Sequence, residues 1–150
     1  MAKTNQAPRF VRLANILTKT MLRTGLPLSG FGYPMYLLTV RGRKSGQPHT
    51  TPVVIVEQEG KRYLLSPFGV VDWVRNLRAS GMALFTRTRQ HEQVRARELP
   101  RDEAGLVLKG LLTSGRNPPI LGYFGVSAHS SAEDFGRAAV EHPVFVLERN

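Results

Sequence analysis

The sequence predicts an α+β fold in which about five or six antiparallel strands form a small barrel with a few helices packed outside it. Most of the expected strands are joined by short hairpins, and they do not alternate with helices as a doubly wound parallel sheet requires. The chain has 150 residues, of which 41% are hydrophobic, which suffices for one domain with a substantial core. We therefore expect residues 1–150 to form a single barrel domain.

The first expected element is an amphipathic helix over residues 9–24. Its apolar residues recur at helical spacing and basic side chains flank them. Gly25 and Pro27 end the pattern. Residues 1–30 are therefore expected to be a helix followed by a loop, and this loop continues over residues 28–34.

The expected strands are rich in β-branched and aromatic residues and are separated by turn residues such as Glu59-Gly60. They cover residues 36–41, 52–57, 62–65, 82–88, 93–99 and 144–147. Three further helices are expected over residues 70–78, 100–112 and 131–141, the last with Ser131 as its N-cap. Residues 113–130 carry few signals of regular structure.

The positive charge is concentrated at the start of the chain. The formal net charge is +10, and the first 56 residues contain eight Lys or Arg but no Asp or Glu. This balance indicates a partner that carries negative charge. We do not expect nucleic acid, because the strands lack the mixture of aromatic and basic residues that reads it.

Several classes of site are excluded or disfavoured by composition. The chain contains no Cys, which excludes disulfides, thiolate catalysis and Cys-ligated metals. The four His residues lack metal-ligand spacing relative to one another, so no metal site is expected. We see neither an apolar run of the roughly 20 residues that span a bilayer nor a secretory signal, and we expect a cytoplasmic protein.

Two segments are candidate binding sites. The first is the basic turn over residues 42–48, where Arg43 supplies a fork of donors, Lys44 a point charge and Ser45 a hydroxyl. Its spacing differs from that of a Walker loop, and a solvated basic hairpin turn is the alternative. The second segment covers residues 66–77, where a helix N-terminus can bind an anion. From the residues alone, core packing is the better explanation of Trp73, and interaction with the helix dipole is the better explanation of Asp72.

Together these segments resemble the deazaflavin (coenzyme F-420)-dependent nitroreductase family of actinobacterial oxidoreductases. The resemblance rests on residues 38–53, 63–69 and 73–77 and covers about residues 10–100. It implies a split β-barrel related to flavin-mononucleotide-binding barrels. It also implies coenzyme F-420, whose phosphate and poly-glutamate tail would match the basic, acid-free start of the chain.

The resemblance implies a set of coenzyme-binding residues. Residues of the basic turn would bind the phosphate or tail, and residues of the next strand would line the coenzyme. Residues at the end of the following strand would lie near its ring or ribityl chain, and residues of the helix would close the site. In that order they are Arg43, Lys44 and Ser45; His49, Thr51, Pro52, Val53 and Val54; Leu64, Ser66 and Pro67; and Asp72, Trp73 and Asn76.

The implied reaction is hydride transfer from the reduced coenzyme to a small organic or quinone-like acceptor, as in nitroreductases and quinone reductases. The protein would then position two partners and exclude water, with Tyr123 as the candidate catalytic group that protonates the acceptor. The chain departs from the family at two places. Its C-terminal region has one Tyr where the nitroreductases of the family have a tyrosine-rich stretch, and His49 stands where the family has an Arg. Coenzyme binding therefore carries over better than the choice of acceptor.

Three alternatives remain open at the level of sequence. One is a coenzyme- or lipid-binding barrel without turnover, and another is an oxidoreductase that uses flavin mononucleotide (FMN). The third concerns residues 9–24, which either pack on the barrel or lie on the anionic inner face of the cell membrane. A homodimer is expected only by analogy with related folds.

Overall fold

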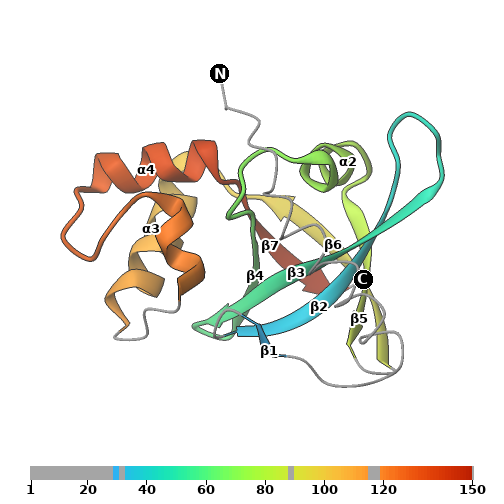
Figure 1. Cartoon of the computed structure of the whole chain (residues 1–150), viewed down its shortest axis with the longest axis horizontal. Coiled ribbons are helices and arrows are strands. Elements are labelled where there is room, and N and C mark those ends of the chain that lie inside the picture. The colour runs from blue at the N-terminus through green and yellow to red at the C-terminus, as the bar shows by residue number, and fades with distance from the viewer. Residues whose placement is uncertain (1–28, 31–32, 88–89, 115–118, 150) are drawn as a thin grey trace.

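The computed structural model describes residues 29–30, 33–87, 90–114 and 119–149. Figure 1 shows a sheet of strands with helices packed around it. The strands are β1 (Ser29–Gly30), β2 (Tyr33–Arg41), β3 (Pro48–Gln58), β4 (Lys61–Leu65), β5 (Met82–Arg87), β6 (Gln90–Glu98) and β7 (Val144–Arg149). The helices are α2 (Asp72–Ser80), α3 (Arg101–Thr113) and α4 (Ala132–Glu141), with a 3-10 helix η1 (Pro119–Phe124).

The sheet closes on itself. Its strands follow the order β1-β2-β3-β4-β7-β6-β5, and β2 pairs again with β5, so that Leu38 lies opposite both Thr51 and Phe85. All of these pairings are antiparallel. The structure therefore confirms the predicted antiparallel barrel with flanking helices.

Several boundaries differ from the prediction. β2 begins at Tyr33, which pairs with Gly30 of β1, and β3 begins at Pro48, which pairs with Arg41 across the hairpin. Backbone ladder bonds thus extend past the apolar residues that gave the sequence signal. The predicted loop over 28–34 therefore contains β1 and the first residues of β2, and β6 begins at Gln90 rather than residue 93. Helix α2 begins two residues later than predicted, because Val71 is extended and serves as the N-cap. The segment 113–130 contains η1.

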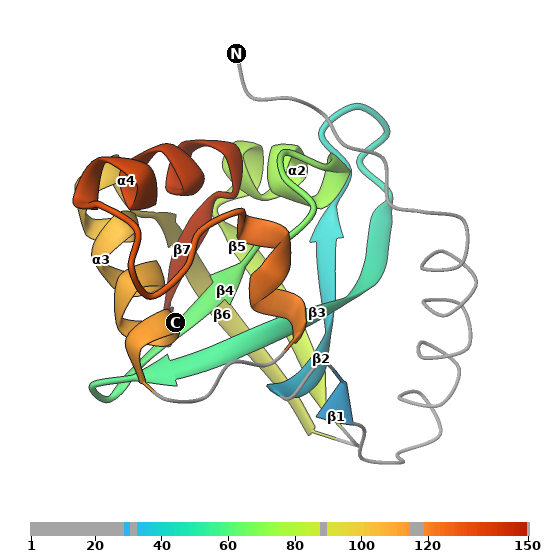
Figure 2. The ribbon, with the colours of Figure 1, turned by 60° about the vertical axis from the view of Figure 1, so that its left-hand side comes forward.

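Two apolar clusters explain the pattern of β3. Val53 and Ile55 point into the barrel, where they meet Leu64 and Phe85. Their neighbours on β3 belong to a second cluster that includes buried residues of α3 and α4, because successive side chains of a strand point to opposite faces. Both faces of this part of β3 are thus buried, and its sequence is continuously apolar. Figures 1 and 2 show α3 and α4 together on one side of the barrel.

Helix α2 is fixed at one end of the barrel. Val74 and Leu77 are 0% and 1% exposed and belong to the barrel-interior cluster, while Gly81 ends the helix with a positive φ of 70°. Figure 2 shows the loop between β2 and β3 beside α2 at the top of the barrel. The fold therefore brings together the two segments that the sequence singled out.

The opposite end of the barrel is closed by charged side chains. Arg62 and Glu92 lie two residues from Leu64 and Val94, which face the interior, so they share that face. They form a bidentate ion pair with two 2.8 Å contacts, and Arg149 approaches Glu92 to 3.4 Å.

The predicted helix over residues 9–24 and its membrane contact lie outside the described residues. Among the helices that the structure does describe, none is long and apolar enough to cross a membrane.

Replacing Glu92 by Gln is expected to lower the melting temperature by about 2–4 °C near neutral pH, since a partly exposed ion pair contributes about 1 kcal/mol. The pair with Arg62 lowers the pKa of Glu92 from its ordinary 4.5. Its stabilisation is therefore present above pH 4.5 and is lost as the pH falls through the lower folded-state pKa. Thermal unfolding near neutral pH and at about pH 3 measures both effects.

The matched control is Glu148→Gln on β7. Glu148 makes one 3.7 Å contact with Arg97, and both side chains are more than half exposed, so this variant should melt like the wild type. An equal drop in melting temperature in the two variants would show that the Arg62–Glu92 pair stabilises the fold no more than an exposed ion pair does.

Candidate active site

The turn between β2 and β3 has a defined backbone. The N–H of Gly42 donates to the carbonyl of Gln47 at 2.7 Å, and the N–H of Gly46 donates to the carbonyl of Gly42 at 2.9 Å. Gly46 has a φ of 71°, a conformation that favours glycine. A Cβ on Gly42 would lie 2.8 Å from Nε2 of His49. The two glycines are therefore required by the shape of the turn and by the closeness of His49.

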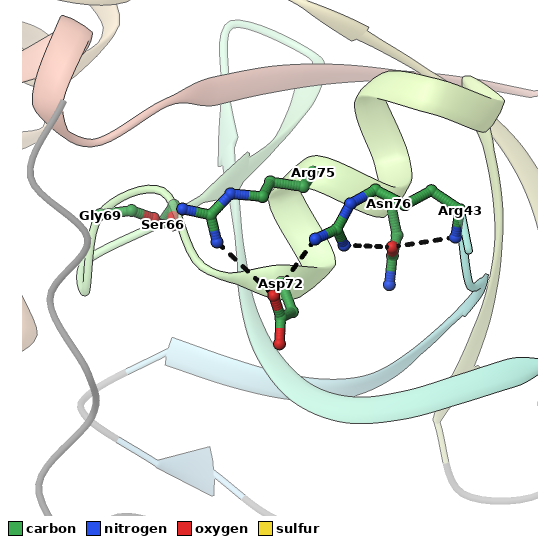
Figure 3. Close-up of polar contacts among 6 residues, drawn as sticks. All are labelled: Arg43, Ser66, Gly69, Asp72, Arg75 and Asn76. Carbon is green, nitrogen blue, oxygen red and sulfur yellow. Dashed lines mark hydrogen bonds and ion pairs between the residues drawn. The ribbon is translucent and has the colours of Figure 1, made fainter. Parts of the chain in front are cut away.

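Helix α2 holds this turn through Arg43 and Asn76. The side-chain oxygen Oδ1 of Asn76 accepts the backbone N–H of Arg43 at 3.1 Å and its guanidinium Nη1 at 2.8 Å. The Nη2 atom of Arg43 lies 3.7 Å from Asp72, which is also 3.5 Å from Arg75. Figure 3 shows these four side chains around the first turns of α2. Asn76 is buried, whereas the Asp72 side chain is 83% exposed.

The turn keeps donors for a ligand. Within the described chain, the N–H groups of Gly42, Arg43, Gly46 and Gln47 are hydrogen-bonded, but those of Lys44 and Ser45 have no partner. The ammonium group of Lys44 likewise makes no ion pair with a described residue, and it is exposed. Two adjacent amides beside a cation form the kind of concavity that binds an anion.

The second segment is a tight loop between β4 and α2. The hydroxyl of Ser66, a residue that is 1% exposed, donates to the carbonyl of Gly69. The N–H of Gly69, whose φ is 88°, donates back to the carbonyl of Ser66 at 3.2 Å. Val71 provides no side-chain cap for α2. The first N–H groups of the helix therefore have no side-chain acceptor from the N-cap.

His142 is hydrogen-bonded to this loop. Its Nδ1–H donates to the carbonyl of Ser66 at 3.2 Å, and the neighbouring Pro143 carbonyl accepts the N–H of Ser66 at 3.2 Å. Burial lowers the pKa of His142 despite the hydrogen bond, so the neutral imidazole is the stable form near neutral pH. The ring of Phe124 packs against it with centroids 5.0 Å apart.

Tyr123 lies beside the same loop. Its ring makes an edge-to-face contact with Phe68 at 5.0 Å between centroids, and the residue is 42% exposed. Its phenolic hydroxyl has no hydrogen-bond partner within the described residues. The structure thus brings the predicted catalytic tyrosine to the loop of the predicted coenzyme-binding residues Ser66 and Pro67.

The predicted residues of β3 and β4 do not share one surface. His49 is exposed, and Thr51 and Pro52 are half-buried. Val53 and Leu64 belong to the barrel interior, whereas Val54 faces α3 and α4 on the other side of the sheet. Trp73 is half-buried and tilts against Phe145 at 6.1 Å, as the core-packing alternative expects. The side chains at the described surface of the site are therefore mainly those of the turn, Asp72, Tyr123 and the half-buried residues.

Gly42, Phe68 and Arg75 lie in the two candidate segments but were given no role toward the coenzyme, and His142 lies outside both segments. The spacing of Asp72 and Arg75 on one helix face was a readable signal. The contacts of Phe68 and His142 reach across the fold and have no local signal. In the described residues, no group of three His, Asp or Glu side chains gathers where it would hold a metal.

The chain is similar in sequence to one family of known proteins. A sequence model described as F420H2-dependent quinone reductase matches residues 11–113, which include the basic turn, the Ser66–Gly69 loop and α2. A comparison with curated proteins returned no match.

Two solved structures illustrate the likeness of fold. One described as F420-H2 dependent reductase (FDR-A) has a TM-score of 0.52 and 23% identity, over 77% of this chain and 94% of its own. Another, described as a domain-swapped dimer, has a TM-score of 0.54 and 21% identity, over 93% of this chain and 97% of its own. These likenesses confirm the split β-barrel.

The family match covers well over half of the chain and agrees with the deazaflavin-dependent family that its motifs indicated. The chain belongs to the F420H2-dependent quinone reductase family, and it is a reductase that depends on coenzyme F-420.

Proposed function

We propose that the protein transfers a hydride from reduced coenzyme F-420 to a small quinone-like acceptor, with the β2–β3 turn holding the phosphate or acidic tail of the coenzyme. The observation that carries this proposal concerns the amides of Lys44 and Ser45 beside the Lys44 ammonium, which have no hydrogen-bond partner among the described residues. Arg43 adds a guanidinium that is already oriented by Asn76 and Asp72. This donor set fits a phosphate dianion.

The chain's own residues would bind and orient, while the reduced coenzyme, when bound, supplies the hydride. Arg43 and Arg75 share one exposed carboxylate, that of Asp72, so the site remains net positive for an incoming anion. The Ser66 hydroxyl is committed to the Gly69 carbonyl. Ser66 therefore acts by shaping the loop rather than by donating a hydrogen bond to the ligand.

The acceptor side is proposed to include Tyr123. A quinone takes up a hydride and a proton when it is reduced to a hydroquinone. The phenolic hydroxyl of Tyr123, which no described residue hydrogen-bonds, can donate that proton. The family description supports a quinone-like acceptor. Reduction of nitro compounds and peripheral membrane contact have no support from the described residues and remain sequence-based expectations.

Lys44 tests the anion site of the turn. Lys44→Ala is expected to weaken binding of oxidised coenzyme F-420 about tenfold, the loss of roughly one charge-assisted hydrogen bond. Titration followed by the fluorescence of Trp73, the only Trp, measures the dissociation constant, and FMN serves as the competitor. Preference for FMN would favour the alternative flavin enzyme.

Lys61→Ala is the matched control. Lys61 is exposed on the β3–β4 hairpin, at the far end of β3. This strand has 11 residues, so its ends lie roughly 33 Å apart. The control removes the same charge from the molecule, and its binding should match the wild type. Equal weakening in both variants would mean that only overall charge matters and that the turn is not the anion site.

Tyr123 tests the acceptor side of the proposed reaction. Tyr123→Phe is expected to lower kcat for a soluble quinone about tenfold or more and to leave the KM for coenzyme unchanged, because the hydroxyl acts on the acceptor. Steady-state kinetics with reduced coenzyme measures both constants. Tyr123→Leu, which also removes the contact with Phe68, separates ring packing from the hydroxyl. An unchanged kcat in the Phe variant would remove Tyr123 from the mechanism.

A further inference from the structure

We infer that Asn76 is a positioning residue whose buried side-chain oxygen fixes the β2–β3 turn in its anion-binding shape. The inference rests on the proposed function, because it concerns the turn that is proposed to hold the coenzyme. It differs from the role that the family resemblance implies, in which Asn76 lines the coenzyme itself.

The geometry carries this inference. Oδ1 of Asn76 accepts two hydrogen bonds from Arg43, one of them from the backbone N–H at 3.1 Å. A bond to a backbone N–H restrains the chain itself, whereas a bond to a flexible side chain does not. The Arg43 amide is held by Asn76, and the N–H groups of Gly46 and Gln47 are bonded on the other side of the turn. The amides of Lys44 and Ser45 therefore lie between two restrained points, which limits how they can point. Within this turn they are the two N–H groups without a partner among the described residues.

Burial of Asn76 makes the loss of its bond to the Arg43 N–H costly. Asn76 is 5% exposed, so a substitution that removes Oδ1 leaves the partly buried Arg43 N–H without its protein acceptor, which is costly. Two donors converge on one atom of the amide, which assigns that atom as oxygen. Figure 3 shows the amide nitrogen of Asn76 pointing away from Arg43, and it has no partner among the described residues. A direct coenzyme contact would use this nitrogen, so the two roles of Asn76 can be separated.

The first test needs no coenzyme. Amide hydrogen exchange, measured by NMR, should show a protected Arg43 N–H in the wild type and exchange about tenfold faster or more in Asn76→Leu, because the acceptor is gone. The amide of Leu38 on β2 should be unchanged, which shows that the barrel is intact. Asn76→Asp keeps an acceptor oxygen and should restore protection. An Arg43 amide that exchanges equally in wild type and Asn76→Leu overturns the inference.

The second test is a double-mutant cycle on coenzyme binding. Asn76→Leu and Lys44→Ala should each weaken binding about tenfold, and the double variant should lose about tenfold to twentyfold rather than about a hundredfold, because both act through one turn. Additive losses would show that Asn76 acts independently of the turn and overturn the inference.

Two controls keep the outcomes distinct. Val74→Ala removes a core side chain of α2 without changing the contact with Arg43, so it should lower stability and leave the Arg43 amide protected. Loss of that protection would show that any damage to α2 loosens the turn, and it would overturn the inference. If Lys44→Ala alone binds coenzyme normally, the proposed anion site fails. The exchange comparison then still decides whether Asn76 fixes the turn.

Discussion

Strand β2 is paired along both edges, and the candidate site depends on this constraint. Its residue Leu38 lies opposite Thr51 of β3 and Phe85 of β5, which closes the barrel and creates an interior for apolar side chains. Val74 and Leu77 anchor α2 in that interior. Because the basic turn is simply the continuation of β2, closing the barrel sets the turn beside α2, and the contacts between Arg43 and α2 follow from this placement.

The contacts between the turn and α2 are of two physical kinds. The pairing of Arg43 with Asp72 involves a carboxylate that is 83% exposed, and such pairs contribute little and are readily exchanged for another anion. The bond to Asn76 is buried and neutral on the acceptor side, so a change of charge nearby does not remove it. An anion can therefore replace Asp72 as partner of Arg43 while the turn keeps its shape, which reduces the ordering cost of binding.

Local patterns predicted the elements better than the site. The hairpin at Glu59-Gly60 has the two positive φ values that its sequence suggested, and Ser131 forms a full capping box with Asp134, because both depend on neighbouring residues. The bond between Arg43 and Asn76 joins residues 33 positions apart, and no local pattern encodes it. The implied role of Val54 beside Val53 overlooked strand alternation, which places the two side chains on opposite faces of β3.

The part of the chain beyond the family match supports the motif within it. The family match ends at residue 113, but the Ser66 carbonyl is held by His142, which directly follows α4. Protonation of His142 would keep Nδ1–H as a donor and would place a charge against the ring of Phe124; its lowered pKa thus reflects burial rather than a lost hydrogen bond. The loop beside Tyr123 is therefore held by His142 and Pro143, which join α4 to the barrel strand β7, and the motif residues alone are not sufficient to form it.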